Sequence, residues 1–142
     1  MKGGWSGAIV TAPNCSTSIM VLPIKPVFDE YGIEKIHNTT MQAISGGDYP
    51  GVSSMDMIDN VVPYIGGEEE KLVLESKKIL GEINNPANYE LEAFCNRVNI
   101  LDGHLESIFI KTKKVADLEN IKTLLKPSSG LIYIVVQENL LL

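Results

Sequence analysis

The chain has 142 residues, of which 44% are hydrophobic and 21% charged, and its formal net charge is −6 at pH 7. This length and composition predict one globular domain with its own core. The acidic balance argues against a nucleic-acid partner, because phosphate backbones are bound by basic patches. No apolar run is long enough to span a bilayer and no secretory signal is recognisable, so a cytoplasmic protein that does not bind a membrane is expected.

The chain has only two cysteines, Cys15 and Cys95, and two histidines, His37 and His104. Their spacing matches no zinc-binding pattern, so no metal site is predicted. Both thiols are expected to be free, as is usual in a reducing compartment.

The stretch around Cys15 is the first candidate for chemistry. An apolar run over 8–12 leads to a turn at Pro13, and a longer apolar segment follows. The pattern predicts a strand over 8–12 and a helix that begins at Cys15, bends or restarts near Pro26 and stops at Gly32. A helix N-terminus stabilises a thiolate, so Cys15 is a candidate nucleophile; the alternative is an inert buried thiol.

The middle of the chain predicts a strand over 33–43, a glycine-rich loop over 45–51, a short helix over 53–60 and a clear helix over 68–81. Acidic residues open this last helix and lysines lie near its end, which suits the helix dipole. Glu68, Lys71 and Glu75 share one of its faces, either as a solvated ion-pair row or as part of a ligand site.

The C-terminal part predicts two strands, over 89–100 and 105–112, joined as an antiparallel hairpin by the turn at Asp102-Gly103. Arg97 and His104 flank this turn, either as surface decoration or as an anion clamp and a base. A helix over 115–126 and a strand over 131–137 follow. The final three leucines suggest a fragment, a divergent remnant or a partner surface.

Several short motifs occur in a fixed order from about residue 7 to residue 137. They are Pro13-Asn14-Cys15-Ser16-Thr17, Met41-Gln42-Ala43-Ile44-Ser45-Gly46, Tyr49-Pro50-Gly51, Met55-Asp56, Asp59-Asn60, Pro63-Tyr64-Ile65, Glu68-Glu69-Glu70-Lys71, Lys78-Ile79-Leu80-Gly81, Arg97-Val98 and Asp102-Gly103-His104. In this order and spacing they resemble the aspartate-semialdehyde dehydrogenases, above all their archaeal and fungal branch.

The resemblance covers one domain of that family, the catalytic and dimerisation domain, over residues 1–142. It implies an α+β fold, a mixed or antiparallel sheet with helices packed on one face, like the second domain of glyceraldehyde-phosphate dehydrogenase. The family's nucleotide-binding Rossmann domain is expected to be absent, because the chain has no G-x-G-x-x-G fingerprint. The implied partners are a second copy of the chain, in a homodimer or higher oligomer, and a separate nucleotide-binding domain.

The resemblance also implies a reaction, the NADPH-dependent reduction of aspartyl phosphate to aspartate semialdehyde through a thioester on the cysteine. NADP is expected to be held mainly by the missing domain. The implied roles are nucleophile for Cys15, general acid/base for His104, orientation of the intermediate for Gln42, substrate binding for Arg97, Glu68, Lys71 and Asn14, and cofactor contact for Ser45 and Gly46.

Two other interpretations stay open. One is a related acyl reductase for malonyl-CoA or N-acetylglutamyl phosphate, although Glu68 and Arg97 together favour an aspartyl substrate. The other is a non-catalytic dimerisation or interaction module. If the chain is the catalytic domain of an aspartate-semialdehyde dehydrogenase, it is expected by itself to form a dimer and not to turn over, since nothing in it would hold NADPH above the thiol.

Overall fold

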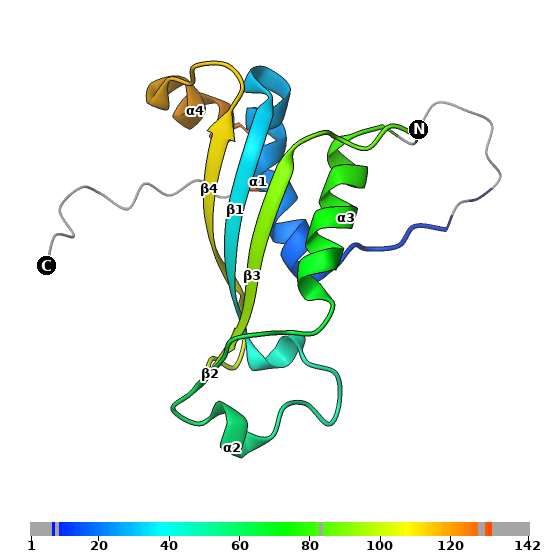
Figure 1. Cartoon of the computed structure of the whole chain (residues 1–142), viewed down its shortest axis with the longest axis vertical. Coiled ribbons are helices and arrows are strands. Elements are labelled where there is room, and N and C mark those ends of the chain that lie inside the picture. The colour runs from blue at the N-terminus through cyan, green and yellow to red at the C-terminus, as the bar shows by residue number, and fades with distance from the viewer. Residues whose placement is uncertain (1–6, 8, 83, 128–129, 132–142) are drawn as a thin grey trace, which may run out of the picture.

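The fold is described by a computed structural model that covers residues 7, 9–82, 84–127 and 130–131 (Figure 1). Along these residues the elements are α1 (Cys15–Tyr31), β1 (Ile33–Gln42), the 3-10 turn η1 (Ile44–Gly46), α2 (Ser54–Met57), β2 (Val61–Val62), α3 (Glu68–Leu80), β3 (Glu90–Val98), β4 (Leu105–Thr112) and α4 (Leu118–Leu125). Helices and strands alternate along much of the chain, and they assemble into a single sheet covered by helices.

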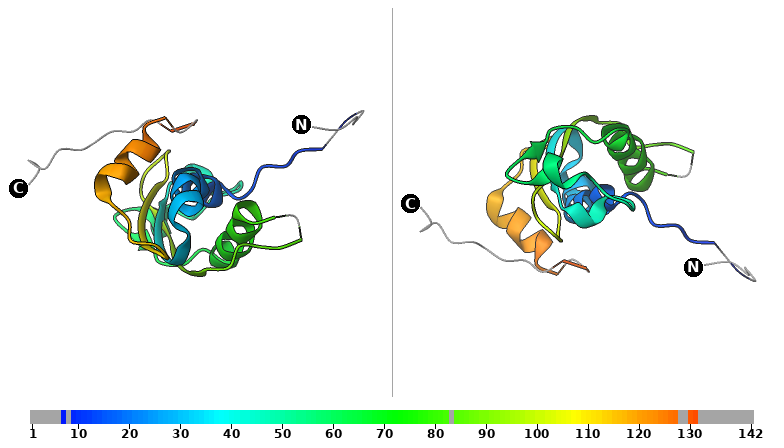
Figure 2. Two further views of the ribbon diagram at one scale, coloured as in Figure 1. Left: turned by 90° about the horizontal axis from the view of Figure 1, so that it is seen from above. Right: turned by 90° about the horizontal axis from the view of Figure 1, so that it is seen from below.

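The strands form one mixed sheet in the order β2-β3-β1-β4. β1 is parallel to β3 and antiparallel to β4, and β2 is antiparallel to β3. α1 and α3 lie on the same side of the sheet, and α1 runs behind it in the view of Figure 1; Figure 2 shows the same layers end-on. The predicted fold class, a mixed sheet with helices packed on one face, is confirmed.

The predicted hairpin between the two later strands is wrong. β3 and β4 are not neighbours, because β1 lies between them and pairs with both. Their connection passes the end of β1 and is hydrogen-bonded to the η1 turn that follows it. The Ile44 N–H donates to the Ile100 carbonyl (2.8 Å) and the Ser45 N–H to the Leu101 carbonyl (3.0 Å). Gly103 does adopt the positive φ of a turn (87°), but a turn reverses the chain without fixing which strand it pairs with.

Helix α1 begins at Cys15 and stops at Gly32, whose φ of 64° ends it, as predicted. A bend or a restart is predicted near Pro26; the restart does not occur, because one helix continues through Pro23 and Pro26. The two prolines leave backbone carbonyls without helical partners. The helix persists because one of its faces is buried against the sheet and α3. The buried residues of this face are Met20, Val21, Ile24 and Val27.

One predicted strand is not found, and another cannot be compared with the structure. Residues 9–12 have no regular structure, and Ile9 is 95% exposed, so the lead-in to Pro13 is not a strand over these residues. An apolar run becomes a strand only where a sheet edge accepts it. The strand predicted over 131–137 falls, from residue 132 on, outside the described residues.

The core lies between the sheet and the two long helices. Its buried members include Met20 and Ile24 of α1, Ile33 and Ile36 of β1, Leu72 and Leu80 of α3, and Cys95 of β3. Leu72 and Leu80 form the buried side of α3, whereas Ile79 is 42% exposed. At the far end, α4 packs against α1, and the Asn120 side chain donates to the Tyr31 hydroxyl (2.6 Å).

Gly81 ends α3 at a point where the chain folds back tightly. A methyl group there would meet the backbone nitrogen of Ala87 and lie 2.6 Å from the Asn85 carbonyl oxygen. Backbone has little room to yield, so Gly81→Ala is expected to lower the free energy of unfolding by about 1–3 kcal/mol. Urea unfolding followed by circular dichroism measures this. Gly66→Ala is the control, since its nearest atom is 4.0 Å away; an equal loss in both variants would refute the steric explanation.

Candidate active site

The candidate residues come from five chain segments that meet at one end of the sheet, the lower end in Figure 1. The parallel strands β1 and β3 both end there, α1 and α3 both begin there, and β4 starts there. The N-termini of two helices at one place favour negative charge, which suits both a thiolate and an anionic ligand.

Asn14 fixes the start of α1 to α3. Its side-chain oxygen caps the helix by accepting from the N–H groups of Ser16 (3.1 Å) and Thr17 (3.2 Å). Its side-chain amide donates to Glu68 (2.7 Å), and its backbone N–H donates to Glu75 (2.7 Å). The next residue, Cys15, is exposed at the first position of the helix, so its sulfur is accessible to a reactant.

Glu68 connects several of the predicted residues. Besides the Asn14 amide, its carboxylate accepts from the buried Gln42 side chain (3.3 Å) and lies 3.5 Å from the Lys71 ammonium group. Gln42 donates also to the Thr40 hydroxyl (3.3 Å). The Glu68 side chain is only 12% exposed, so it belongs to an internal network rather than to a solvated row, while Lys71 is 55% exposed at its rim.

The peptide groups of Ala43 hold Arg97 and His104. The Ala43 N–H donates to His104 Nδ1 (3.1 Å), and its carbonyl accepts from Arg97 Nη1 (2.7 Å). Because Nδ1 is an acceptor here, the neutral imidazole carries its proton on Nε2. Arg97 is only 6% exposed, which excludes the surface-decoration interpretation for this residue.

The η1 turn covers His104. A Cβ added to Gly46 would lie 2.9 Å from His104 Nε2 and 3.3 Å from Arg97 Nη1, so only glycine leaves the imidazole undisturbed. The Ser45 hydroxyl donates to Asp102 (2.8 Å), and this hydrogen bond lowers the pKa of the Asp102 carboxyl group. The η1 turn and the segment before β4 are therefore fixed to each other.

The structure thus links Asn14, Gln42, Glu68 and Lys71 in one network, and joins Arg97, His104 and Gly46 around Ala43, the neighbour of Gln42. Thr40 and the Ala43 peptide groups were not predicted as parts of the site, and Glu75 was predicted only to share a helix face with Glu68 and Lys71. Thr40 and Ala43 act through a single hydroxyl and the backbone, for which the sequence carries no distinct signal. The described residues contain no cluster of His, Cys, Asp and Glu suited to a metal ion.

The two thiols differ sharply in their surroundings. Cys15 is exposed, whereas Cys95 is fully buried and burial raises its pKa to about 11. Only the thiolate is alkylated, so Cys15 is expected to react with iodoacetamide at pH 8 at least about 100-fold faster than Cys95. Peptide mass spectrometry against time measures both rates. Cys15→Ser should remove the fast phase and Cys95→Ser should leave it; preferential labelling of Cys95 would refute Cys15 as the nucleophile.

Among the described residues, no helix is long and apolar enough to cross a membrane. Residues 24–141 match the family model of the semialdehyde dehydrogenase dimerisation domain. The chain is 44% identical over 134 residues to an aspartate-semialdehyde dehydrogenase of Methanothermobacter thermautotrophicus, which matches 92% of this chain and 39% of that protein.

Two solved structures share the fold. The aspartate-semialdehyde dehydrogenase of Candida albicans with NADP matches with a TM-score of 0.70 and 43% identity, over 78% of this chain and 33% of that one. Aspartate-semialdehyde dehydrogenase II of Vibrio cholerae complexed with ASA matches with a TM-score of 0.74 and 28% identity, over 86% and 44%. The chain therefore spans less than half the length of these relatives, and it belongs to the semialdehyde dehydrogenases through their dimerisation domain.

Proposed function

We propose that the chain is the catalytic and dimerisation domain of an NADPH-dependent aspartate-semialdehyde dehydrogenase, which reduces aspartyl 4-phosphate to aspartate 4-semialdehyde. The observation that carries this proposal is the exposed thiol of Cys15 beside a network that presents Glu68, Arg97 and His104 at one end of the sheet. The relatives named for this activity, and the neighbour structure that holds ASA, support it. Two free thiols suit the reducing cytoplasm, where we place the reaction.

The charges of the site match the charges of the proposed substrate. Aspartyl phosphate carries a carboxylate, an ammonium group and a phosphate. The Arg97 guanidinium suits the carboxylate through paired hydrogen bonds, the Glu68 carboxylate suits the ammonium group, and the Lys71 ammonium suits the phosphate. Asn14 and Gln42, which both donate to Glu68, orient it.

The Cys15 thiolate attacks the acyl carbon of the substrate, a carbon–sulfur bond forms and phosphate leaves with the electron pair of the broken bond to carbon. Gln42 then orients the thioester. NADPH supplies a hydride to the thioester carbon when it is bound. His104 acts as the general acid/base by sharing its Nε2 proton with the oxygen that gains charge as the hydride adds, and it keeps this proton as the carbon–sulfur bond breaks, the aldehyde leaves and the Cys15 thiolate returns.

Gly46 is the residue that best fits a contact with the cofactor. It is exposed, and its missing side chain leaves the space next to His104 Nε2 open. Ser45 fits less directly, because its hydroxyl donates to Asp102 and its N–H to Leu101. We propose that the backbone of these two residues approaches the nicotinamide end of NADP, most of which would be held by another domain.

The acylation half-reaction tests the proposal without a cofactor. Incubation of the chain with aspartyl phosphate is expected to add one aspartyl group to Cys15, seen as a mass gain that hydroxylamine removes, with release of phosphate. Cys15→Ser should give neither. N-acetylglutamyl phosphate and malonyl-CoA are the competing donors. Faster acylation by one of these would favour the related acyl reductases, and no acylation by any donor would favour a non-catalytic module.

A further inference from the structure

A row of polar side chains lies directly beneath the candidate site, on the helix-covered face of the sheet. Thr40 of β1 is paired in register with Cys95 of β3 and with Glu106 of β4. The adjacent row contains Gln42, paired with Arg97, and the start of β4 beside His104. Glu106 is therefore one row below the catalytic imidazole, and Thr40 beside it bonds to Gln42.

Only one of the two side-chain carboxyl oxygens of Glu106 has a hydrogen-bond partner. Its Oε2 accepts from the Asn38 amide nitrogen (2.8 Å), and Asn38 is fully buried. Both Oε1 of Glu106 and Oδ1 of Asn38 are buried without a donor. The salt bridges among the described residues include none to Glu106. A buried carboxylate without a cation and with an unsatisfied oxygen is costly, and so is an unsatisfied amide oxygen.

A single proton on Glu106 removes both deficits. With the proton on Oε1, the carboxyl group donates to Asn38 Oδ1 while Oε2 still accepts from the Asn38 amide. We propose that Glu106 is held as an un-ionised carboxylic acid paired by two hydrogen bonds with Asn38, and that this neutral pair is a positioning element beneath the catalytic row. Burial raises the pKa of Glu106 to about 7, which agrees with this geometry.

The charge on Glu106 matters because of the groups around it. His104 lies just before β4, Cys95 of β3 lies on the other side of Thr40, and Glu68 and Glu69 of α3 also act on Cys95. From β1 it meets only the neutral Asn38 and Thr40. The ionisable groups around Glu106 are thus the Cys95 thiol and the carboxylates of α3, with His104 and the Arg97 guanidinium in the adjacent row. A negative charge on Glu106 would therefore add to the negative potential beneath the candidate site, which opposes attack by an anionic thiolate there. This consequence for catalysis rests on the proposed function, whereas the protonation state of Glu106 does not.

Infrared spectroscopy tests the protonation state directly on the unaltered chain. At pH 6 the carbonyl band of an un-ionised carboxylic acid is expected, and it should disappear as the pH rises through about 7. The band should be absent from Glu106→Gln and present in the control Glu90→Gln, because the Glu90 side chain is 76% exposed. No such band in the unaltered chain at pH 6, as when a buried water satisfies an ionised Glu106, would overturn the proposal.

Stability against pH gives a second, independent test. A folded-state pKa raised from 4.5 to about 7 means that the folded chain keeps a proton which the unfolded chain releases between these values. The stability from this proton is complete below pH 4.5 and is lost as the pH rises through about 7. Glutamine reproduces both hydrogen bonds to Asn38, so the urea midpoint of Glu106→Gln should fall less than that of the unaltered chain over this range. An equal fall in the two chains would contradict the proposal.

The reactivity of Cys15 tests the link to the site. At pH 8, where Glu106 is ionised, Glu106→Gln should be alkylated by iodoacetamide about threefold faster than the unaltered chain, with equal rates at pH 6. Equal rates at both pH values would overturn the positioning role even where the infrared band is present. Absence of acylation by any acyl donor would instead contradict the proposed function and leave the infrared result unaffected.

Discussion

Arg97→Lys is expected to slow the acylation of Cys15 by aspartyl phosphate about 100-fold or more. Arg97 is 6% exposed and one of its nitrogens is already held by the Ala43 carbonyl, so its guanidinium is fixed in one orientation before substrate arrives. A planar guanidinium group held in this way can donate two parallel hydrogen bonds to a carboxylate, which a lysine ammonium group does not reproduce.

The size of the effect follows from the loss of a buried, charge-assisted contact, which costs about 3 kcal/mol. Each 1.36 kcal/mol corresponds to about tenfold in rate. The same variant should keep the iodoacetamide reactivity of Cys15, because iodoacetamide has no carboxylate for Arg97 to bind.

Lys111→Met is the matched control. Lys111 of β4 forms an ion pair with Glu34, is 67% exposed and lies away from the candidate site. Its substitution should therefore leave acylation unchanged. Single-turnover mass spectrometry under identical conditions compares the three chains. An acylation rate in Arg97→Lys within about threefold of the unaltered chain would exclude Arg97 as the carboxylate-binding residue.

Features that depend on neighbours along the chain could be predicted from the sequence. Asn14 before Cys15 and Gly32 after Tyr31 mark the ends of α1 through local capping chemistry, and the structure confirms both ends. The acidic start and basic end of α3 are likewise local signals.

Features that depend on residues far apart in the chain could not be predicted from the sequence. The Asp102-Gly103 turn carries no information about β1, which inserts between the two strands that the turn connects. The apolar run over 8–12 predicts a strand because its composition does not show whether a sheet edge is available, and residues 9–12 have no regular structure. Part of the site could not be predicted either, because Ala43 holds Arg97 and His104 through backbone groups that nearly every residue possesses.

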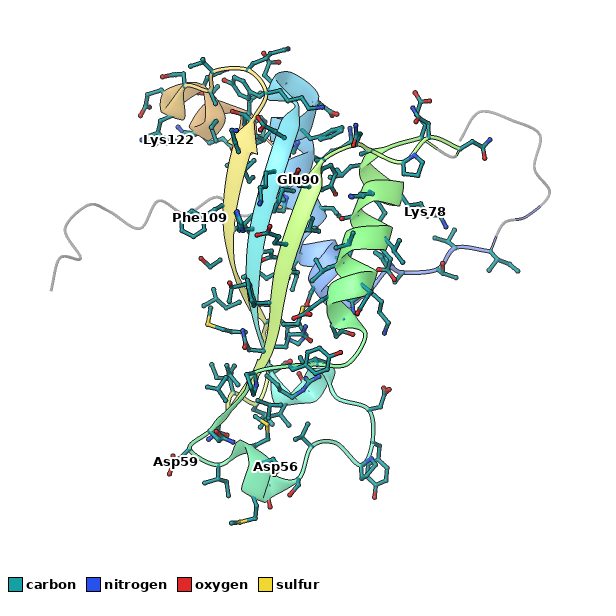
Figure 3. The ribbon with its side chains drawn as sticks, viewed as in Figure 1. Asp56, Asp59, Lys78, Glu90, Phe109 and Lys122 are labelled. Carbon is teal, nitrogen blue, oxygen red and sulfur yellow. The ribbon has the colours of Figure 1, made fainter. Side chains whose placement is uncertain are left out.

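The sheet face opposite α1 and α3 leads to the prediction with the largest effect on assembly. Three large apolar side chains are exposed there, Phe94 (62%), Leu105 (61%) and Phe109 (72%). Phe109 projects outward from β4 in Figure 3. Apolar residues gathered on one uncovered face mark an interaction surface, and the matched family model is that of a dimerisation domain.

We expect two copies of the chain to pack these faces together about a twofold axis, so that light scattering gives twice the chain mass of 15.6 kDa. Phe109→Glu should return the mass to that of one chain. At a twofold interface each substitution occurs twice, and the loss of an aromatic contact with burial of an unpaired charge costs about 3 kcal/mol or more. The dimer dissociation constant should therefore rise about 100-fold or more.

Val115→Glu separates this effect from a general gain in charge. Val115 is 99% exposed but lies between β4 and α4, outside the open face, so this variant should stay dimeric. Phe109→Glu should keep its circular dichroism spectrum and its Cys15 alkylation rate, because the helix-covered face of β4 is unchanged. A monomeric unaltered chain would refute the dimer. A dimer that survives Phe109→Glu at low micromolar concentration would place the interface on another surface of the chain.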